Sequence, residues 1–416
     1  MIRYAIAWQP GTDNLGDDLR TLAASRLLPR VDLALDADRL DESLPDLTGD
    51  DRAVTLLSGP LMQHSAHWPP AERISPACVG VHVSEEDVWG LRAAALDGAG
   101  KAYLERCAPI GCRDDRTLRL MDALGLPHQL TACLTLTLER PEVPEHAPYI
   151  CCVDVPESVT QALREFASGA GVEVRESTHL LENPVPDYEA RMRHAEEVVQ
   201  TYAGARFVVT RRLHCAMACL AVGTPVLMLY NNVYEDLSRF SPMDGMMHMK
   251  TVDAFLEEIG ESGFPDLWRN PPQAAKWRES LREAVRQAIE EAEKRPLPIL
   301  PEQEAAQWRQ ARLYAMTDAA REKIHQLEQA RYEALHEKFA LLMREDTAKA
   351  AVSTLLKEPE TGRALRRIAL RRRTAATPWH KRPALWLRLL RGQEKPENLL
   401  EATEEALKDL GWPERS

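Results

Sequence analysis

The chain has 416 residues, 28% of them charged, and a formal net charge of −12 at pH 7. This length predicts two α/β domains plus an appendage, and the acidic balance argues against a general nucleic-acid binder. No apolar run reaches membrane-spanning length, and the N-terminal residues do not have the pattern of a signal peptide.

The first 140 residues alternate strand-like and helix-like segments. Short apolar runs at 4–8, 53–57 and 78–83 predict strands, and helical spacing predicts helices over 19–28 and 115–124. This order is typical of a parallel, doubly wound sheet. We therefore expect an N-terminal Rossmann-like domain over residues 1–140.

A Pro-rich, polar stretch at 139–148 is typical of a linker, and after it the pattern starts again. Strands are expected at 149–155, 172–175, 207–210 and 226–230, with helices between them. This predicts a second Rossmann-like domain over 149–298. Two such domains facing a cleft form a GT-B-like α/β fold, and we expect the active site in that cleft.

The composition changes from about residue 299, and we expect a C-terminal helical extension over 299–416. Residues 302–345 predict a long helix or helical hairpin, which either pairs with a second copy as a homodimer or folds back on the body. Residues 361–392 contain ten Lys or Arg and no Asp or Glu. With its Trp and Leu residues this segment is typical of an interfacial helix in peripheral contact with a membrane. The alternatives are a helix docked on the acidic body, or a tail that binds RNA or an anionic glycan.

The eight cysteines are scattered, mostly in apolar surroundings. We expect them to be buried, reduced thiols, as in a cytoplasmic protein. Cys215 and Cys219 share a helix face, but no second ligand pair at zinc spacing accompanies them. No metal site is therefore expected.

The turn after the strand at 207–210 is the most informative segment. It places Arg212 and His214 between the carboxyl end of a strand and the start of an apolar helix, where open α/β sheets bind ligands. Helix N-termini bind anions, a guanidinium offers them a fork of donors, and an imidazole moves protons near neutral pH. The alternative is that both residues only cap a core helix.

Four segments resemble the polysaccharide pyruvyl transferase family in their order and spacing. They are the Asn-Leu-Gly-Asp-Asp loop and helix at 14–24, the Trp-Pro-Pro stretch leading to Gly-Val-His at 68–82, the segment at 109–137 that includes a Gly-Cys-Arg-Asp turn, and the Arg-Leu-His-Cys turn with its Gly-Thr-Pro at 212–225. The resemblance covers roughly residues 1–250. The extension from residue 299 is outside it.

The resemblance implies a GT-B-like fold, phosphoenolpyruvate as donor substrate with no cofactor, and an acceptor sugar of a cell-envelope polysaccharide or its lipid-linked precursor. The product would be a pyruvate ketal on two hydroxyls of one sugar. In this chain Arg212 would hold the phosphate or carboxylate of the donor, and His214 would be the proton donor or the acid for the leaving phosphate. Arg113 would be the second cation of the site, unless it forms an ion pair with Asp114 or Asp115.

The loop after the first strand would contribute Asn14, Gly16 and Asp17. Gly16 would allow close backbone approach, and Asp17 or Asp18 could deprotonate a sugar hydroxyl. The alternative is an Asx turn that caps the following helix.

An aromatic stretch near residue 68 is the expected acceptor side. Trp68 would stack against a sugar, with His64 as a hydrogen-bonding partner. His67 is expected in a surface loop, and no role is assigned to His82. Residues 58–60 are Ser-Gly-Pro where the family pattern is Asn-Gly-Trp, which leaves the acceptor open.

Two alternative functions remain. The first is a nucleotide-sugar glycosyltransferase with the same architecture, in which Glu235 or Asp236 would bind a ribose. The second is a catalytically lapsed scaffold of envelope polysaccharide assembly that binds the envelope machinery through its helical tail. For the transferase we expect a cytoplasmic location, peripheral at the inner face of the membrane.

Overall fold

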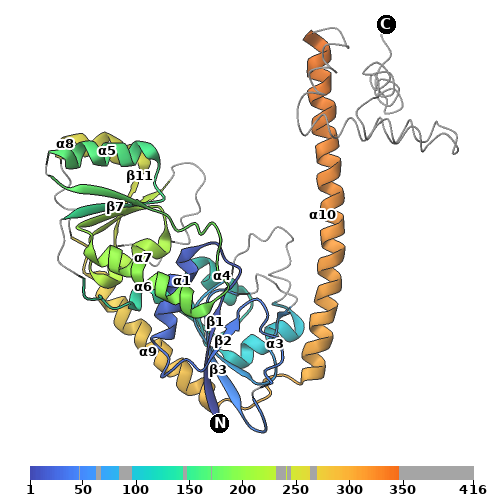
Figure 1. Ribbon diagram of the computed structural model, residues 1–416. Coiled ribbons are helices and arrows are strands. Elements are labelled where there is room, and N and C mark those ends of the chain that lie inside the picture. The colour runs from blue at the N-terminus through green and yellow to red at the C-terminus, as the bar shows by residue number, and fades with distance from the viewer. Residues whose placement is uncertain are drawn as a thin grey trace, which may run out of the picture. The chain divides into compact units, whose positions relative to one another are not determined.

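The computed structural model describes residues 1–45, 47–61, 67–83, 96–143, 148–169, 171–230, 240, 245–262 and 269–345. The chain divides into two units, Met1–Asp318 and Ala319–Ser416. Both β-sheets belong to the first unit (Figure 1).

The first sheet has six strands in the order β2-β1-β3-β4-β5-β6, and every neighbouring pair is parallel. Its strands are β1 (Ile2–Trp8), β2 (Leu33–Asp36), β3 (Arg52–Pro60), β4 (Ile74–His82), β5 (Ile110–Cys112) and β6 (His128–Leu130). The order changes direction at β1, which lies between β2 and β3. Such a switch point is where open α/β sheets bind ligands.

The second sheet has five strands in the order β11-β10-β9-β7-β8, again all parallel. Its strands are β7 (Tyr149–Val153), β8 (Glu173–Ser177), β9 (Phe207–Thr210), β10 (Val226–Tyr230) and β11 (His248–Thr251). Here the switch point is at β7, between β8 and β9. The predicted α/β class with two parallel sheets is confirmed.

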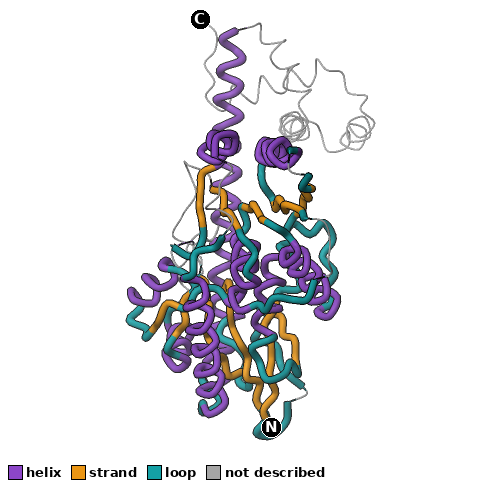
Figure 2. The backbone as a smooth tube through the Cα atoms, turned by 90° about the vertical axis from the view of Figure 1, so that its left-hand side faces the viewer, coloured by secondary structure: helices purple, strands orange, loops and turns teal. Residues whose placement is uncertain are grey.

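A layer of helices between the two sheets forms the largest hydrophobic core (Figure 2). It contains α1 (Leu15–Ser25), the short 3-10 helix η2 (Leu134–Thr137), α6 (Tyr188–Gly204), α7 (Leu213–Val222) and α9 (Gln273–Lys294). Side chains alternate across each strand, so that Tyr4 and Ile6 of β1 join this core while Ala5 and Ala7 face the other side.

Two smaller cores cover the outer faces of the sheets. On the first sheet the covering helices are α3 (Gly98–Cys107) and α4 (Asp115–Ala123), and on the second they are α5 (Glu157–Ser168) and α8 (Val252–Ser262). All eight cysteines are buried and unpaired with one another. Each sheet thus has helices on both of its faces, as is usual for parallel sheets.

Helix α9 crosses back to the first sheet, although its residues fall in the range expected for the second domain. Ser75 of β4 donates to the carbonyl of Ala292 at 2.7 Å, and the Tyr4 hydroxyl of β1 donates to Glu293 at 2.6 Å. The end of the chain's second half thus packs against strands of its first half.

Helix α1 begins at Leu15, one turn before the predicted start at residue 19. Asn14 is its N-cap, and the Asn14 side chain accepts a hydrogen bond from the Gly16 N–H at 3.1 Å. The cap considered as the alternative for this loop therefore exists, and Asn14 supplies it, not Asp17 or Asp18.

Helix α10 (Glu302–Glu345) matches the predicted range as one continuous helix. Near its start Arg309 donates to the carbonyl of Pro69 at 2.8 Å. Leu313, Ile324 and Leu327 are exposed apolar residues on it, and pairing with a second copy stays a prediction.

The basic segment 361–392 lies outside the described residues. None of the described helices is both long and apolar enough to cross a membrane.

Candidate active site

Polar side chains gather where strands of both sheets end. They lie within the last residues of β3 and β4 or after β1, β5, β7 and β9, and comprise Asn14, Asp17, Ser58, His82, Arg113, Asp114, Asp154, Arg212 and His214. In each sheet these strands include the one at the switch point, β1 or β7, and one of its neighbours, β3 or β9. The topology therefore gathers these residues at the edge of each sheet where ligands bind.

His214 lies in the first turn of α7 and is 8% exposed. A Cβ on Gly16 would lie 2.4 Å from His214 Nδ1, so α1 approaches the imidazole as closely as a glycine backbone allows. His214 Nε2 is buried and has no hydrogen-bond partner among the residues the structure describes. The group that lies closest to the Gly16 backbone is thus the side chain of His214, and contact of Gly16 with a ligand stays a prediction.

Burial lowers the pKa of His214 well below its usual value, and the positive charges of Arg113 and Arg20 lower it further. The imidazole is therefore neutral at pH 7 in this structure. Arg20 and Arg113 are themselves buried, so two guanidinium groups and one imidazole share a poorly solvated region.

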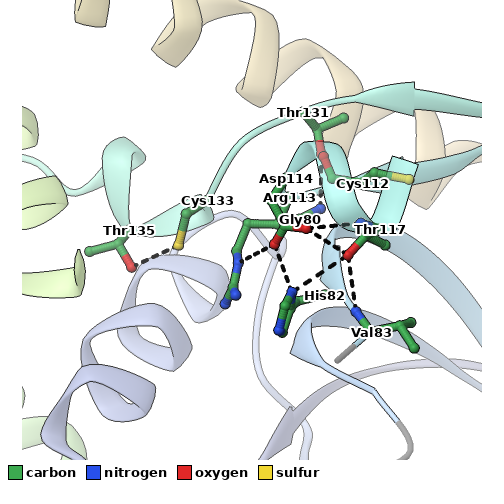
Figure 3. A network of polar contacts seen from close by, with 10 residues as sticks. All are labelled: Gly80, His82, Val83, Cys112, Arg113, Asp114, Thr117, Thr131, Cys133 and Thr135. Atoms are coloured by element: carbon green, nitrogen blue, oxygen red, sulfur yellow. Dashed lines mark hydrogen bonds and ion pairs between the residues drawn. The ribbon is translucent and has the colours of Figure 1, made fainter. Parts of the chain in front are cut away.

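Arg113 is held by a buried carboxylate (Figure 3). Its Nε donates to Asp114 Oδ2 at 3.3 Å, and His82 Nδ1 lies 2.7 Å from the same oxygen. The other oxygen of Asp114 caps α4 by accepting from the backbone N–H and the hydroxyl of Thr117. The ion pair considered as the alternative for Arg113 exists, and it fixes Arg113 beside His214.

Asp114 is fully buried and ionised. Burial alone would raise its pKa, but the His82 hydrogen bond and the positive charges of His82 and Arg113 lower it below its usual value. Because an ionised carboxylate only accepts hydrogen bonds, His82 Nδ1 must carry the proton between them.

Arg20 extends from α1 into the same region and is 1% exposed. Its Nη1 donates to the carbonyl oxygen of Ser58 at 2.6 Å and to the Ser58 hydroxyl at 3.1 Å, and its Nη2 donates to Gln9 at 3.4 Å. Its Nε is buried without a partner among the described residues. Arg20 was not predicted as a site residue, although its position four residues after Gly16 puts both on one helix face.

Arg212 is the N-cap residue of α7, as the predicted strand–helix turn requires. Its Nε donates to Asp154 Oδ2 at 2.7 Å, and its side chain is 41% exposed. Asp154 follows β7 and also accepts from the Thr178 hydroxyl and the His179 N–H. The guanidinium therefore already has a carboxylate partner, which no sequence pattern indicated.

The two acidic residues of α1 differ in surroundings. Asp17 is 9% exposed and accepts from the Thr12 hydroxyl at 2.9 Å and from the Asn14 amide at 3.3 Å. Asp18 is buried in an ion pair with Arg191 of α6, at 2.7 Å. Asp17 is thus the acidic residue that remains beside the site, and Asp18 links α1 to α6.

The aromatic stretch near residue 68 is part of the core. Trp68 is 2% exposed, donates from its indole N–H to the carbonyl of Gly100, and packs edge-to-face on Tyr103. A buried indole offers no face to a sugar, so the predicted stacking role of Trp68 is wrong. His67 pairs with Asp41 at 2.7 Å, and His64 lies outside the described residues, as do Glu235 and Asp236.

No group of three or more His, Cys, Asp or Glu side chains is placed to hold a metal ion within the described ranges. What the arrangement offers is a cationic, poorly solvated region with a neutral imidazole. The first turn of α7 adds to it, because Arg212 makes no side-chain cap and leaves the helix N-terminus for an anion.

Comparison with known proteins supports the resemblance seen in the sequence. Residues 94–233 match the model of the polysaccharide pyruvyl transferase family, a family of transferases, and this range includes Arg113, Arg212 and His214. The predicted resemblance is therefore confirmed over these residues. No curated protein matches the chain.

Three solved structures resemble the chain distantly. A functionally uncharacterised protein of Klebsiella pneumoniae is 11% identical, with 57% of this chain and 88% of that chain covered and a TM-score of 0.34. A UDP-N-acetylglucosamine 2-epimerase is 12% identical over 70% and 94% of the two chains, with a TM-score of 0.41. The E. coli heptosyltransferase WaaC, solved with ADP, is 14% identical over 74% and 100%, with a TM-score of 0.23.

Proposed function

We propose that this protein is a ketal pyruvyltransferase that moves the pyruvyl group of phosphoenolpyruvate onto a sugar and releases phosphate. The observation that carries the proposal is the buried His214 beside the fixed guanidinium of Arg113, both inside the residues that match the transferase family. The acceptor would be a sugar of a cell-envelope or exopolysaccharide, or of its lipid-linked precursor.

The charge of the site suits this donor. Phosphoenolpyruvate carries a phosphate and a carboxylate, both attached to C2 of one small molecule. A region with two buried arginines and an uncapped helix N-terminus stabilises such an anion more strongly than water-exposed cations would. Arg212 would join through its Nη nitrogens, because its Nε is bound by Asp154.

The chemistry requires a proton at C3 of the donor. Protonation of C3 makes C2 cation-like, one sugar hydroxyl attacks C2 and loses its proton, and the C2–O bond to phosphate breaks. The second hydroxyl then attacks C2 and loses its proton, which closes the ketal. His214 is the proposed acid, and Asp17 the proposed base for a hydroxyl proton.

His214 can become an acid only if it gains a proton. Without donor its pKa is lowered by burial and by Arg113 and Arg20. A bound polyanion would offset the two arginine charges and raise the pKa of His214. Binding of the donor would therefore favour protonation of His214.

The two parallel sheets would form a GT-B-like pair. The donor would be held between Arg113 of the first half and the Arg212–His214 turn of the second half, with the acceptor entering along the first half. The residues expected to contact the acceptor lie partly outside the described ranges. The cytoplasmic location and the membrane contact of segment 361–392 belong to this proposal, since a lipid-linked acceptor would make such a contact useful.

The first test is thermal unfolding with phosphoenolpyruvate against a panel of nucleotide sugars. A ligand at 100 times its dissociation constant adds about 2.7 kcal/mol to the free energy of unfolding. We expect stabilisation by phosphoenolpyruvate in the native chain and in His214→Gln, and its loss in Arg113→Gln. The next step would be phosphate release with an acceptor panel, which His214→Gln should abolish.

Stabilisation by a nucleotide sugar alone would instead support a glycosyltransferase. If no ligand stabilises the chain, the scaffold function would be favoured. Stabilisation by phosphoenolpyruvate that survives in Arg113→Gln would place the donor elsewhere and contradict the proposed site.

A further inference from the structure

Arg20 is a buried cation whose described partners are all uncharged. The three hydrogen bonds of its guanidinium go to the backbone and hydroxyl oxygens of Ser58 and to the amide oxygen of Gln9, and no carboxylate is among them. A buried charge without a counter-ion is costly, and it is kept in proteins where a partner or a ligand neutralises it.

The acidic residues nearest along the helix are committed elsewhere. Asp18 forms a buried ion pair with Arg191, and Asp17 accepts hydrogen bonds from Thr12 and Asn14. Asp17 attracts Arg20 through space, but Arg113 repels it, and burial outweighs both in lowering the pKa of Arg20. The positive charge of Arg20 is thus only partly balanced within the described residues.

The end of β3 holds the guanidinium in place. Gly59 has a φ of +74°, and a Cβ there would lie 2.4 Å from Arg20 Nε and 2.6 Å from Cζ. The guanidinium therefore lies directly on the glycine backbone, with Ser58 binding one of its ends. A glycine is required at residue 59 both for the backbone angle and for the space that Arg20 occupies.

We propose that Arg20 is an anion-binding residue of the site, which takes one of the two anionic groups of the donor while Arg113 takes the other. The buried Nε without a partner among the described residues, the neutral partners of both Nη atoms and the nearness of Arg20 to His214 and Arg113 carry this proposal. It rests on the proposed function for the identity of the donor. The group that Arg20 binds is a phosphate or a carboxylate, and the experiment separates the two.

The experiment measures binding of three probes, phosphoenolpyruvate, inorganic phosphate and pyruvate, by titration calorimetry. The variants are Arg20→Gln, Arg20→Lys and Gly59→Ala, and the control is Arg26→Gln. Arg26 lies at the end of the same helix and forms an exposed ion pair with Glu196. Circular dichroism and thermal unfolding without ligand show whether each variant is folded.

We expect Arg20→Gln to weaken binding of phosphoenolpyruvate by about 10- to 100-fold, the loss of one charge-assisted contact. The same variant should weaken only one of the two fragments, phosphate or pyruvate, and that fragment identifies the group. Arg20→Lys should lose less, because it keeps the charge but not the fork of donors. Gly59→Ala should weaken the same fragment, because its Cβ displaces the guanidinium, and Arg26→Gln should change nothing.

The outcomes separate this proposal from the proposed function. Native-like binding of phosphoenolpyruvate by a folded Arg20→Gln variant overturns the role of Arg20 and leaves the function standing. If the native chain binds phosphate in an Arg20-dependent way but does not bind phosphoenolpyruvate, the anion site stands and the donor is wrong. Should Arg20→Gln fail to fold, Arg20→Lys and Gly59→Ala decide, and unchanged fragment binding by both refutes the proposal.

Discussion

At the scale of single residues, the site is defined by positive charges that crowd one neutral imidazole. His214 lies against Gly16, and the positive charges of Arg20 and Arg113 lower its pKa. Its protonation therefore depends on the charge of whatever else enters the site. Asp114 also affects the charge of the site, because it holds both Arg113 and His82 in place.

Donor binding should be accompanied by proton uptake at His214. Without donor this pKa is held well below the usual value of about 6.5, and a bound anion offsets the arginine charges that lower it. At pH 6.5 we expect uptake of a fraction of one proton per phosphoenolpyruvate bound. Calorimetric heats measured in two buffers of different ionisation enthalpy give the net proton exchange, which also includes the phosphate group of the donor. His214→Gln should lower this number by the share that His214 takes up. Equal uptake in that variant would refute the assignment.

Asp114→Asn should destabilise the protein in a pH-dependent way. The pKa of Asp114 is lower in the folded state than its unfolded value of about 3.9, so its stabilisation is complete above that pH and is lost as the pH falls further. We expect a cost of about 1.5–3 kcal/mol at pH 7, the range for hydrogen bonds to charged groups. Urea unfolding at pH 7 and below about pH 4 should show the difference shrinking, whereas the exposed Asp122→Asn on the same helix should cost little at either pH.

At the scale of elements, the first turn of α1 sets the geometry of the site. Asn14 caps this helix and Gly16 brings its backbone against His214. In an ordinary helix alanine is favoured over glycine by about 1 kcal/mol. The glycine at this position therefore serves the contact and not the helix.

Gly16→Ala should impair proton transfer more than it affects folding. The added Cβ would lie 2.4 Å from Nδ1 of His214, so the imidazole must shift. A displacement of about 1 Å in a catalytic group can cost about 100-fold in rate. Turnover with a defined acceptor, compared with phosphoenolpyruvate binding, should show a fall in kcat with little change in affinity. Gly11→Ala is the matched control, since a Cβ there would meet nothing within 4 Å.

Much of the fold could be predicted from the sequence because apolar periodicity marks buried strands and helices directly. The strand expected at 207–210 agrees with β9, and the apolar helix expected after the Arg212–His214 turn agrees with α7. The start of α1 was missed because Asn14 caps the helix before its apolar run becomes evident. Arg20 and Asp154 were missed because their significance depends on contacts between segments far apart in the chain. Trp68 was misplaced because a tryptophan in a polar loop and one in a core look alike in sequence.

At the scale of the whole Met1–Asp318 unit, the two sheets share one core. Helices α1, α6, α7 and α9 contribute to a single hydrophobic cluster with strands from both sheets. The loop after β1 also pairs with the loop after β8, where the Leu15 N–H donates to the carbonyl of His179 at 2.8 Å. We therefore expect the two sheets to unfold together.

The buried ion pair between α1 and α6 should be a strong link between the two halves. Arg191→Met leaves the Asp18 carboxylate buried without its partner, which costs about 3–5 kcal/mol. The double variant Arg191→Met/Asp18→Leu should recover most of this loss in urea unfolding. Arg26→Met is the matched control, because the Arg26–Glu196 pair joins the same two helices at an exposed position and should contribute about 0–1 kcal/mol. Equal losses for both arginines would contradict this view.

The burial of all eight cysteines has a practical consequence for studying this protein in solution. Thiol reagents reach only accessible thiolates, and burial raises the pKa of most of these thiols, for example that of Cys78 to about 12. Even Cys215, whose pKa is lowered by hydrogen-bonding neighbours such as Cys219 although burial raises it, has no exposed surface. A cysteine introduced on the surface of α4 and another on α5 would therefore be the only sites labelled by a spin or fluorescent probe among the described residues. The native chain is already a suitable background for measuring the distance between the two sheets as ligands bind.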